Sequence, residues 1–128
     1  MDNYFWFSVL IAMNSLLILI LAMNVSRLRI KYKISLGDGG NKRLMAAIRT
    51  HCNGVEQLPI FAMVILVLTL LGASTSILSI LVIGFTLARL CHAYGMLYRI
   101  FIARRLGAGF TYIFQMIAAL TVCVHLLT

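Results

Sequence analysis

The sequence predicts an all-α integral membrane protein built as a bundle of four helices, and three observations support this fold class. Hydrophobic residues make up 62% of the 128 residues and charged residues only 11%, whereas soluble domains are about 45–50% apolar and about a quarter charged. The apolar residues gather in four long segments, and most of the basic residues lie between these segments. A soluble domain of this length would leave much apolar surface in water, which argues against a cytosolic enzyme or a nucleic-acid-binding domain.

Four segments reach the length of about 20 mostly apolar residues that a membrane-spanning helix requires. Asp2 is the only charged residue before the first segment, and the apolar stretch is longer than a signal-peptide core, so we expect a retained helix. The whole chain, residues 1–128, is expected to form a single domain. The expected spans are 5–25, 44–71, 77–98 and 110–127, and the expected connections are 26–43, 72–76 and 99–109.

The basic residues predict the orientation of these spans. Nine of the eleven Lys and Arg residues lie in the first and third connections, which four spans place on the same side of the membrane. The positive-inside rule makes that side cytoplasmic and places both chain ends outside. Just before the second span, Asn41 or Asp38 is a candidate helix cap, and a plain loop end is the alternative.

A polar stripe lies inside the second span. Arg49, Asn53 and Glu56 recur at i, i+4 and i+7, so their side chains share one face of the helix. His51 lies roughly opposite Arg49 and does not belong to the stripe. Because the span is longer than the hydrocarbon core, we expect Arg49 near the interface and Glu56 deeper. A carboxylate at that depth is costly, so we expect it to face the bundle and to have a partner.

The third span repeats this pattern, because Arg89, His92 and Met96 share a face at i, i+3 and i+7. Together with the basic connections, these faces predict a basic pocket that opens to the cytoplasm and borders lipid. Convergent cations with one carboxylate and one amide suit a small anion that also carries an amine, such as a peptide-like molecule with two carboxylates. The structural alternative is that the arginines reach the lipid headgroups and that Glu56 pairs with one of them.

Two other kinds of site are not expected. No spacing of His, Cys and carboxylate side chains resembles a metal site, and Cys52, Cys91 and Cys123 lie too far apart to suggest a disulfide framework. A transporter or channel is disfavoured, because residues 60–71 and 77–85 are almost wholly apolar and leave no continuous polar path across the membrane.

The second span carries a motif that resembles that of the MAPEG proteins, the membrane-associated proteins in eicosanoid and glutathione metabolism: Arg49-x-His51-x-Asn53-x-x-Glu56-x-x-Pro59. Two further stretches resemble the bacterial, YecN-like branch of the family, namely Gly37-Asp38-Gly39-Gly40 and Ala88-Arg89-Leu90-Cys91-His92-Ala93-Tyr94-Gly95. The resemblance covers essentially the whole chain. It implies a homotrimer in the bacterial inner membrane, with glutathione bound between neighbouring subunits near the cytoplasmic face.

The resemblance also implies a role for each candidate residue. The positions that match the family's glutathione contacts are Arg49, Asn53 and Glu56 in the second span, Arg89 and His92 in the third, and Arg29 or its neighbour Arg27 after the first. In the eicosanoid-forming members, an arginine after the third helix is implicated in stabilising the glutathione thiolate. By its spacing from Arg89, this catalytic role falls to Arg105 or Arg104.

The implied activity is that of a membrane-bound detoxifying glutathione transferase, which uses glutathione as co-substrate, needs no metal and attacks hydrophobic or lipid electrophiles from the bilayer. Glutathione peroxidase activity toward lipid hydroperoxides is a further implied capacity. Gln57 and Met96 stand where relatives carry tyrosine, which weakens any inference of eicosanoid chemistry. The alternative function is a non-catalytic membrane protein of the same fold that binds lipid or a partner protein.

Overall fold

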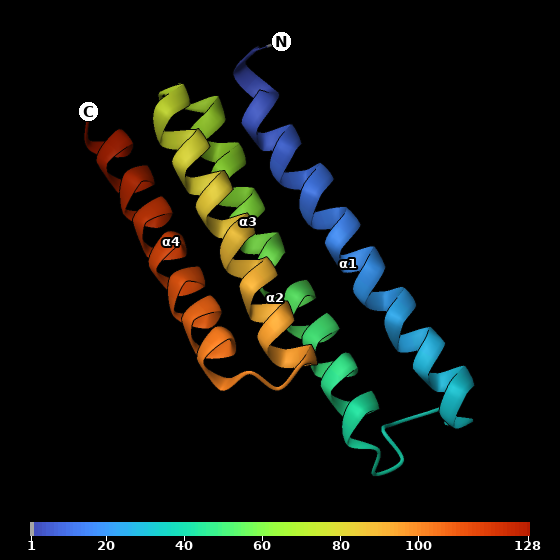
Figure 1. Ribbon diagram of the computed structural model, residues 1–128. Helices are drawn as coiled ribbons and strands as arrows, with labels where there is room; N and C mark the ends of the chain where they lie inside the picture. Colours follow the sequence, from blue (N-terminus) through green and yellow to red (C-terminus); the bar gives the residue numbers. More distant parts are fainter. Residues whose placement is uncertain (1) are drawn as a thin grey trace.

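The computed structural model describes residues 2–128 and folds nearly all of them into helices. A short 3-10 helix, η1 (Asp2–Tyr4), leads into four α-helices: α1 (Phe5–Tyr32), α2 (Lys42–Leu70), α3 (Thr75–Leu97) and α4 (Phe101–Leu127). The helices run up and down beside one another, with both chain ends at one end of the bundle and the α1–α2 and α3–α4 connections at the other (Figure 1). Each α-helix is long and apolar enough to cross a membrane, so the expected all-α class with four such helices is confirmed.

The helices are longer than the expected apolar spans. Both α1 and α4 continue into segments that we expected to be connections. The expected connections 26–43 and 99–109 are therefore wrong in extent, and they shrink to 33–41 and 98–100. Hydropathy marks where a helix leaves apolar surroundings, but Arg and Lys are good helix formers, so a helix can continue through a basic segment.

The start of α2 is capped by Asn41. Its side-chain oxygen accepts a hydrogen bond of 2.9 Å from the backbone N–H of Leu44, which satisfies one of the free donors in the first turn. Asp38 has a different role, because its carboxylate accepts a hydrogen bond of 2.8 Å from the N–H of Gly40 within the turn. Of the two candidate caps, Asn41 is thus the one that the helix uses.

Helices α3 and α4 cross at very close range because glycines lie at the points of contact. A Cβ added to Gly95 would lie 2.1 Å from the backbone nitrogen of Arg104. A Cβ added to Gly107 would lie 2.4 Å from the backbone nitrogen of His92. Small residues at helix contacts allow backbones to approach closely in membranes, where van der Waals packing replaces the hydrophobic effect as the driving force. The two glycines therefore fix where α4 begins relative to α3.

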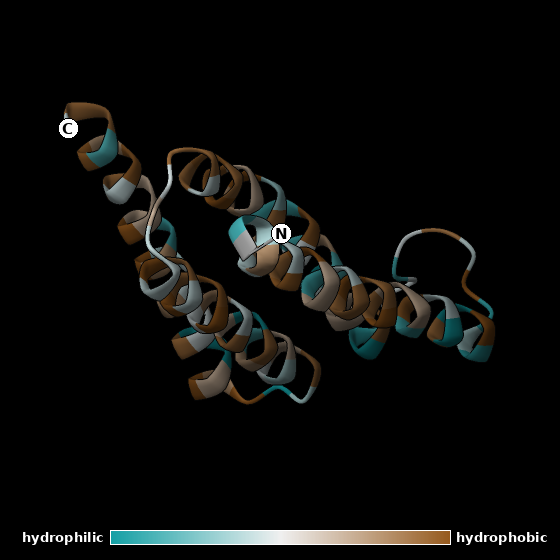
Figure 2. Ribbon diagram, turned by 90° about the horizontal axis from the view of Figure 1, so that it is seen from above, coloured by the Kyte–Doolittle hydropathy of each residue, from teal (hydrophilic) through white to brown (hydrophobic). Residues whose placement is uncertain are grey.

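The main apolar core lies in the half of the bundle nearer the chain ends. There the ring of Phe61 on α2 stacks on the ring of Phe85 on α3, with centroids 3.8 Å apart, and Leu10 of α1 packs into the same cluster. Most other large apolar side chains remain on the outside of the bundle. Figure 2 accordingly shows hydrophobic residues on all sides of the helices, as expected for a surface that meets lipid.

We expect Gly95→Ala to destabilise the fold by about 1–3 kcal/mol, because the added methyl group would meet backbone atoms of α4 that cannot move independently. Gly109→Ala is the matched control: this glycine lies in α4, the helix that Gly95 of α3 contacts, and an added Cβ there would meet nothing within 4 Å. The control should be neutral or stabilising by about 0.4–1 kcal/mol. Thermal unfolding of both variants in detergent is the measurement, and equal stability of the two would contradict the packing role of Gly95.

Candidate functional site

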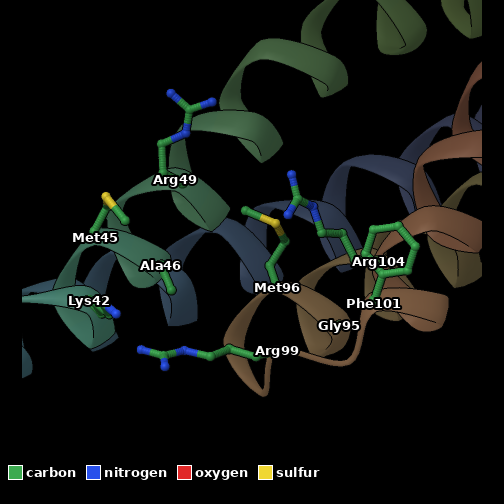
Figure 3. Close-up of a pocket in the computed structure, with 9 residues that line it drawn as sticks. All are labelled: Lys42, Met45, Ala46, Arg49, Gly95, Met96, Arg99, Phe101 and Arg104. Carbon is green, nitrogen blue, oxygen red and sulfur yellow. The ribbon is translucent and has the colours of Figure 1, made fainter.

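A basic pocket opens at the end of the bundle where the α1–α2 and α3–α4 connections lie. Its volume is about 570 Å³, which falls within the usual range for small-molecule sites. The first turns of α2, the end of α3 and the start of α4 enclose it (Figure 3). No acidic residue lines the pocket, and four of its lining residues are cations: Lys42, Arg49, Arg99 and Arg104.

Local backbone structure brings these four cations together. Lys42 and Arg49 lie seven residues apart on α2 and therefore share a face. Arg99 lies in the α3–α4 connection with a left-handed φ of 56°, which costs a non-glycine residue on the order of 1 kcal/mol. Figure 3 shows its side chain extending toward Lys42, while Arg49 and Arg104 project in a common direction. The backbone of Arg104 rests on Gly95, so the close crossing of α3 and α4 places this arginine at the pocket.

The two candidate catalytic arginines face different surroundings. Arg104 lines the basic pocket, whereas Arg105 stacks over the ring of Phe101, with 5.8 Å between its guanidinium carbon and the ring centroid. Arg105 lines a second, mainly apolar cavity of about 450 Å³ on α4, together with Phe110 and Ile113. Both arginines were expected in a loop, but they lie in α4, where consecutive residues point about 100° apart. Only Arg104 shares a pocket with Arg49.

Arg89 and His92 lie inside the bundle rather than in the basic pocket. Only 5% of the surface of Arg89 and 4% of that of His92 is exposed. The guanidinium of Arg89 donates to Asn53 Oδ1 at 2.5 Å and to Thr111 Oγ1 at 3.4 Å, and it contacts His92 Nδ1 at 3.4 Å. These contacts join α2, α3 and α4, so Asn53 and Arg89 are brought together as expected, but Arg89 is not open to a ligand.

The expectation that Glu56 faces the bundle interior is wrong for the bundle formed by α1–α4. Glu56 is exposed, as is Arg49, and Asn53 is half-buried between them. Glu56 takes part in none of the side-chain hydrogen bonds found among residues 2–128. The spacing of the stripe correctly places the three residues on one face of α2. Periodicity, however, does not reveal which element covers that face, and in this structure Arg49 and Glu56 lie on the outside of the bundle.

Arg29 holds the α1–α2 connection. Its guanidinium donates to the carbonyl oxygen of Ile34 at 3.3 Å and to that of Gly37 at 2.8 Å. Arg27, the alternative candidate, donates only to the side chain of Asn24, at 2.8 Å. Neither arginine lines the basic pocket.

Two contributors to the site were not singled out from the sequence. Lys42 could have been found by extending the stripe of Arg49 back by two turns. Thr111 gives no such signal, because an isolated threonine in an apolar helix is ordinary, and its hydroxyl also donates to the carbonyl of Gly107 at 2.7 Å. Within the described residues, no group of three or more His, Cys, Asp or Glu side chains is placed to hold a metal ion.

We expect Arg29→Ala to loosen the α1–α2 connection, because two backbone carbonyls lose a charged donor. A net hydrogen bond contributes about 1 kcal/mol, so amide hydrogen exchange across residues 33–41 should accelerate several-fold. Arg27→Ala is the control and should leave this exchange unchanged, since Arg27 contacts only a side chain of its own helix. Equal acceleration in the two variants would argue that Arg29 does not hold the connection.

Comparisons with known proteins agree with this architecture. A sequence model of the MAPEG family matches residues 7–124, which is nearly the whole chain. The chain is 38% identical over 100 residues to the inner membrane protein YecN of Escherichia coli strain K12, and the alignment covers 78% of this chain and 76% of the relative. The inner membrane protein YecN of Escherichia coli O6:H1 strain CFT073 matches with the same identity and coverage. The four apolar helices and the family match lead to one conclusion: the chain belongs to the MAPEG family.

Proposed function

We propose that the protein is a glutathione transferase of the bacterial inner membrane, in which the thiolate of bound glutathione attacks hydrophobic electrophiles that arrive from the bilayer. The observation that carries this proposal is the basic pocket, where four cations and no acidic residue line a space of about 570 Å³. Glutathione has two carboxylates, which arginine binds with paired hydrogen bonds. Membership of the MAPEG family favours glutathione over other small anions. The YecN relatives, which are named as inner membrane proteins, support the location.

The four cations divide into two proposed roles. Arg49, with Lys42 and Arg99 nearby, binds the carboxylates of glutathione. Arg104 lies on the other wall of the pocket and stabilises the thiolate, since a neighbouring cation lowers the pKa of a thiol from about 8.5. The protein then supplies positioning and electrostatic stabilisation, and no side-chain nucleophile is required. The same thiolate, acting on lipid hydroperoxides, would give peroxidase activity.

The outward-facing stripe supports a homotrimer with glutathione bound between subunits. Arg49 and Glu56 lie exposed on α2 within the apolar part of the chain. Charged side chains that face lipid are costly and normally meet a partner or a water-filled site. A neighbouring copy that covers the stripe would complete the site and bring Glu56 to the ammonium group of glutathione. In the proposed orientation, the basic connections face the cytoplasm and both chain ends lie outside.

Calorimetric titration of the detergent-solubilised protein with glutathione, followed by a conjugation assay with hydrophobic electrophiles, tests this proposal. We expect saturable binding, appearance of thiolate absorbance and conjugate formation. Binding without thiolate or turnover would favour the non-catalytic alternative. Lipid binding that does not depend on glutathione, with no glutathione binding at all, would overturn the proposal.

Arg49→Ala should raise the dissociation constant for glutathione by roughly 10- to 150-fold, because a hydrogen bond to a charged group contributes about 1.5–3 kcal/mol. The matched control is Arg43→Ala, which removes an exposed cation of the same helix that does not line the pocket. The control should change the dissociation constant by less than about twofold, as is usual for screened surface charges. Equal effects of the two substitutions would indicate general electrostatic attraction instead of a defined contact.

Arg104→Ala should lower turnover at saturating glutathione more than it lowers affinity, because a cation aimed at sulfur acts on the thiolate and the transition state. The pKa of the bound thiol should move up toward about 8.5, so activity lost at neutral pH should recover as the pH rises. Arg105→Ala, which alters the apolar cavity on the other side of α4, should leave the pH profile unchanged. A shifted profile in Arg105→Ala alone would reverse the assignment.

A further inference from the structure

The most unusual group inside the bundle is a buried arginine without an acidic partner. Arg89 is 5% exposed, and none of its hydrogen-bond partners Asn53, His92 and Thr111 carries a carboxylate. Buried charges are normally paired, because an unpaired charge in an apolar interior is expensive. Burial also prevents Arg89 from touching a ligand directly. Any influence of Arg89 on a ligand must therefore pass through one of its hydrogen-bond partners.

Asn53 is the partner that leads out of the bundle. It is half-buried on α2, between Arg49 and Glu56 in the exposed stripe, whereas His92 and Thr111 are buried. The hydrogen bond from Arg89 to Asn53 Oδ1, at 2.5 Å, is also the shortest contact of the guanidinium. The other two contacts, each 3.4 Å long, hold the guanidinium from α3 and α4.

The chemistry of this contact fixes the orientation of the amide. A guanidinium has only donors, so the Asn53 atom that faces Arg89 must be the oxygen. The amide nitrogen of Asn53 therefore faces away from Arg89. This nitrogen has no hydrogen-bond partner among residues 2–128, and it is not a buried atom, because no buried side-chain nitrogen or oxygen of these residues lacks a partner. Asn53 thus offers its N–H donors, rather than its oxygen, to the outside.

We propose that Arg89 is a positioning residue that acts through Asn53: it holds the amide so that Nδ2 donates to a carboxylate or carbonyl oxygen of the bound ligand. The inference rests on the proposed glutathione site and deepens it, because it replaces direct contact by Arg89 with a donor subsite at Asn53. A hydrogen bond from a cation to an amide oxygen also polarises the amide, which strengthens its N–H groups as donors. The positive charge of the buried arginine is in this way felt at the surface of the site.

A double-mutant cycle separates this role from a structural one. The full-length protein in detergent is titrated with glutathione as wild type, Arg89→Met, Asn53→Ala and the double variant. Arg89→Met removes the donors while keeping a long apolar side chain, a replacement that buried charges often tolerate. We expect Arg89→Met to weaken binding about tenfold in the wild-type background and less than twofold in the Asn53→Ala background. Additive losses would overturn the inference and leave the glutathione site in place.

Asn53→Asp provides a second test that keeps Arg89 intact. Aspartate has the same shape and still offers an oxygen to Arg89, so the fold should be retained, but it has no N–H group. We expect binding to weaken at least tenfold with no loss of thermal stability. Undiminished binding would show that the site uses an acceptor here and would contradict the inference.

Thr69→Val is the structural control, because it removes a buried hydroxyl of α2 that donates to the carbonyl of Ile65 and contacts neither Arg89 nor Asn53. It should change glutathione affinity by less than twofold, whatever its effect on the unfolding temperature. If Thr69→Val weakens binding as much as Arg89→Met does, the loss in Arg89→Met reflects general stability and the inference fails. If the wild-type protein releases no heat with glutathione, the proposed function falls first and this inference falls with it.

Discussion

The close contact between α3 and α4 is the constraint on which the site depends. Gly95 of α3 lies against the backbone of Arg104, and Gly107 of α4 lies against the backbone of His92. These two contacts fix the position of α4 relative to α3. One turn beyond Gly107, Thr111 reaches Arg89 from the same face of α4. The basic pocket and the buried network are therefore two results of one helix crossing. Larger residues at these glycines would move both at once.

The fold was largely predictable because the membrane restricts the possible structures. Long apolar segments can only be helices in lipid, and their number and order follow from the sequence alone. The ends of the helices were less predictable. Hydropathy falls where α1 and α4 become basic, yet their helical hydrogen bonds continue through Arg29 and through Arg104. At the start of α2 the candidate cap Asn41 marked the boundary correctly, because capping depends on local chemistry that a sequence shows directly.

The sequence predicted most of the residues of the candidate site, but it did not predict which of them lie inside the bundle and which lie on its surface. The spacing of Arg49, Asn53 and Glu56 places them on one face of α2, but a sequence does not state which element lies opposite that face. Arg89 looked equivalent to Arg49, since both are arginines within apolar helices. The structure separates them: Arg49 lies outside the bundle, Arg89 lies inside, and Asn53 lies between. This difference arises from how α2, α3 and α4 pack together, and the spacing of residues within one helix does not predict that packing.

The adjacency of Arg104 and Arg105 has a consequence for how the chain tolerates insertions. The rotation of α4 about its own axis decides which cavity each of these neighbours faces: Arg104 lines the basic pocket and Arg105 lines the mainly apolar cavity. Adding or deleting one residue between Gly95 and Arg104 would rotate the start of α4 by about 100° relative to α3, unless Gly107 gave up its contact with His92. The length of the short connection 98–100 therefore sets which of the two arginines lines the basic pocket and which lines the mainly apolar cavity.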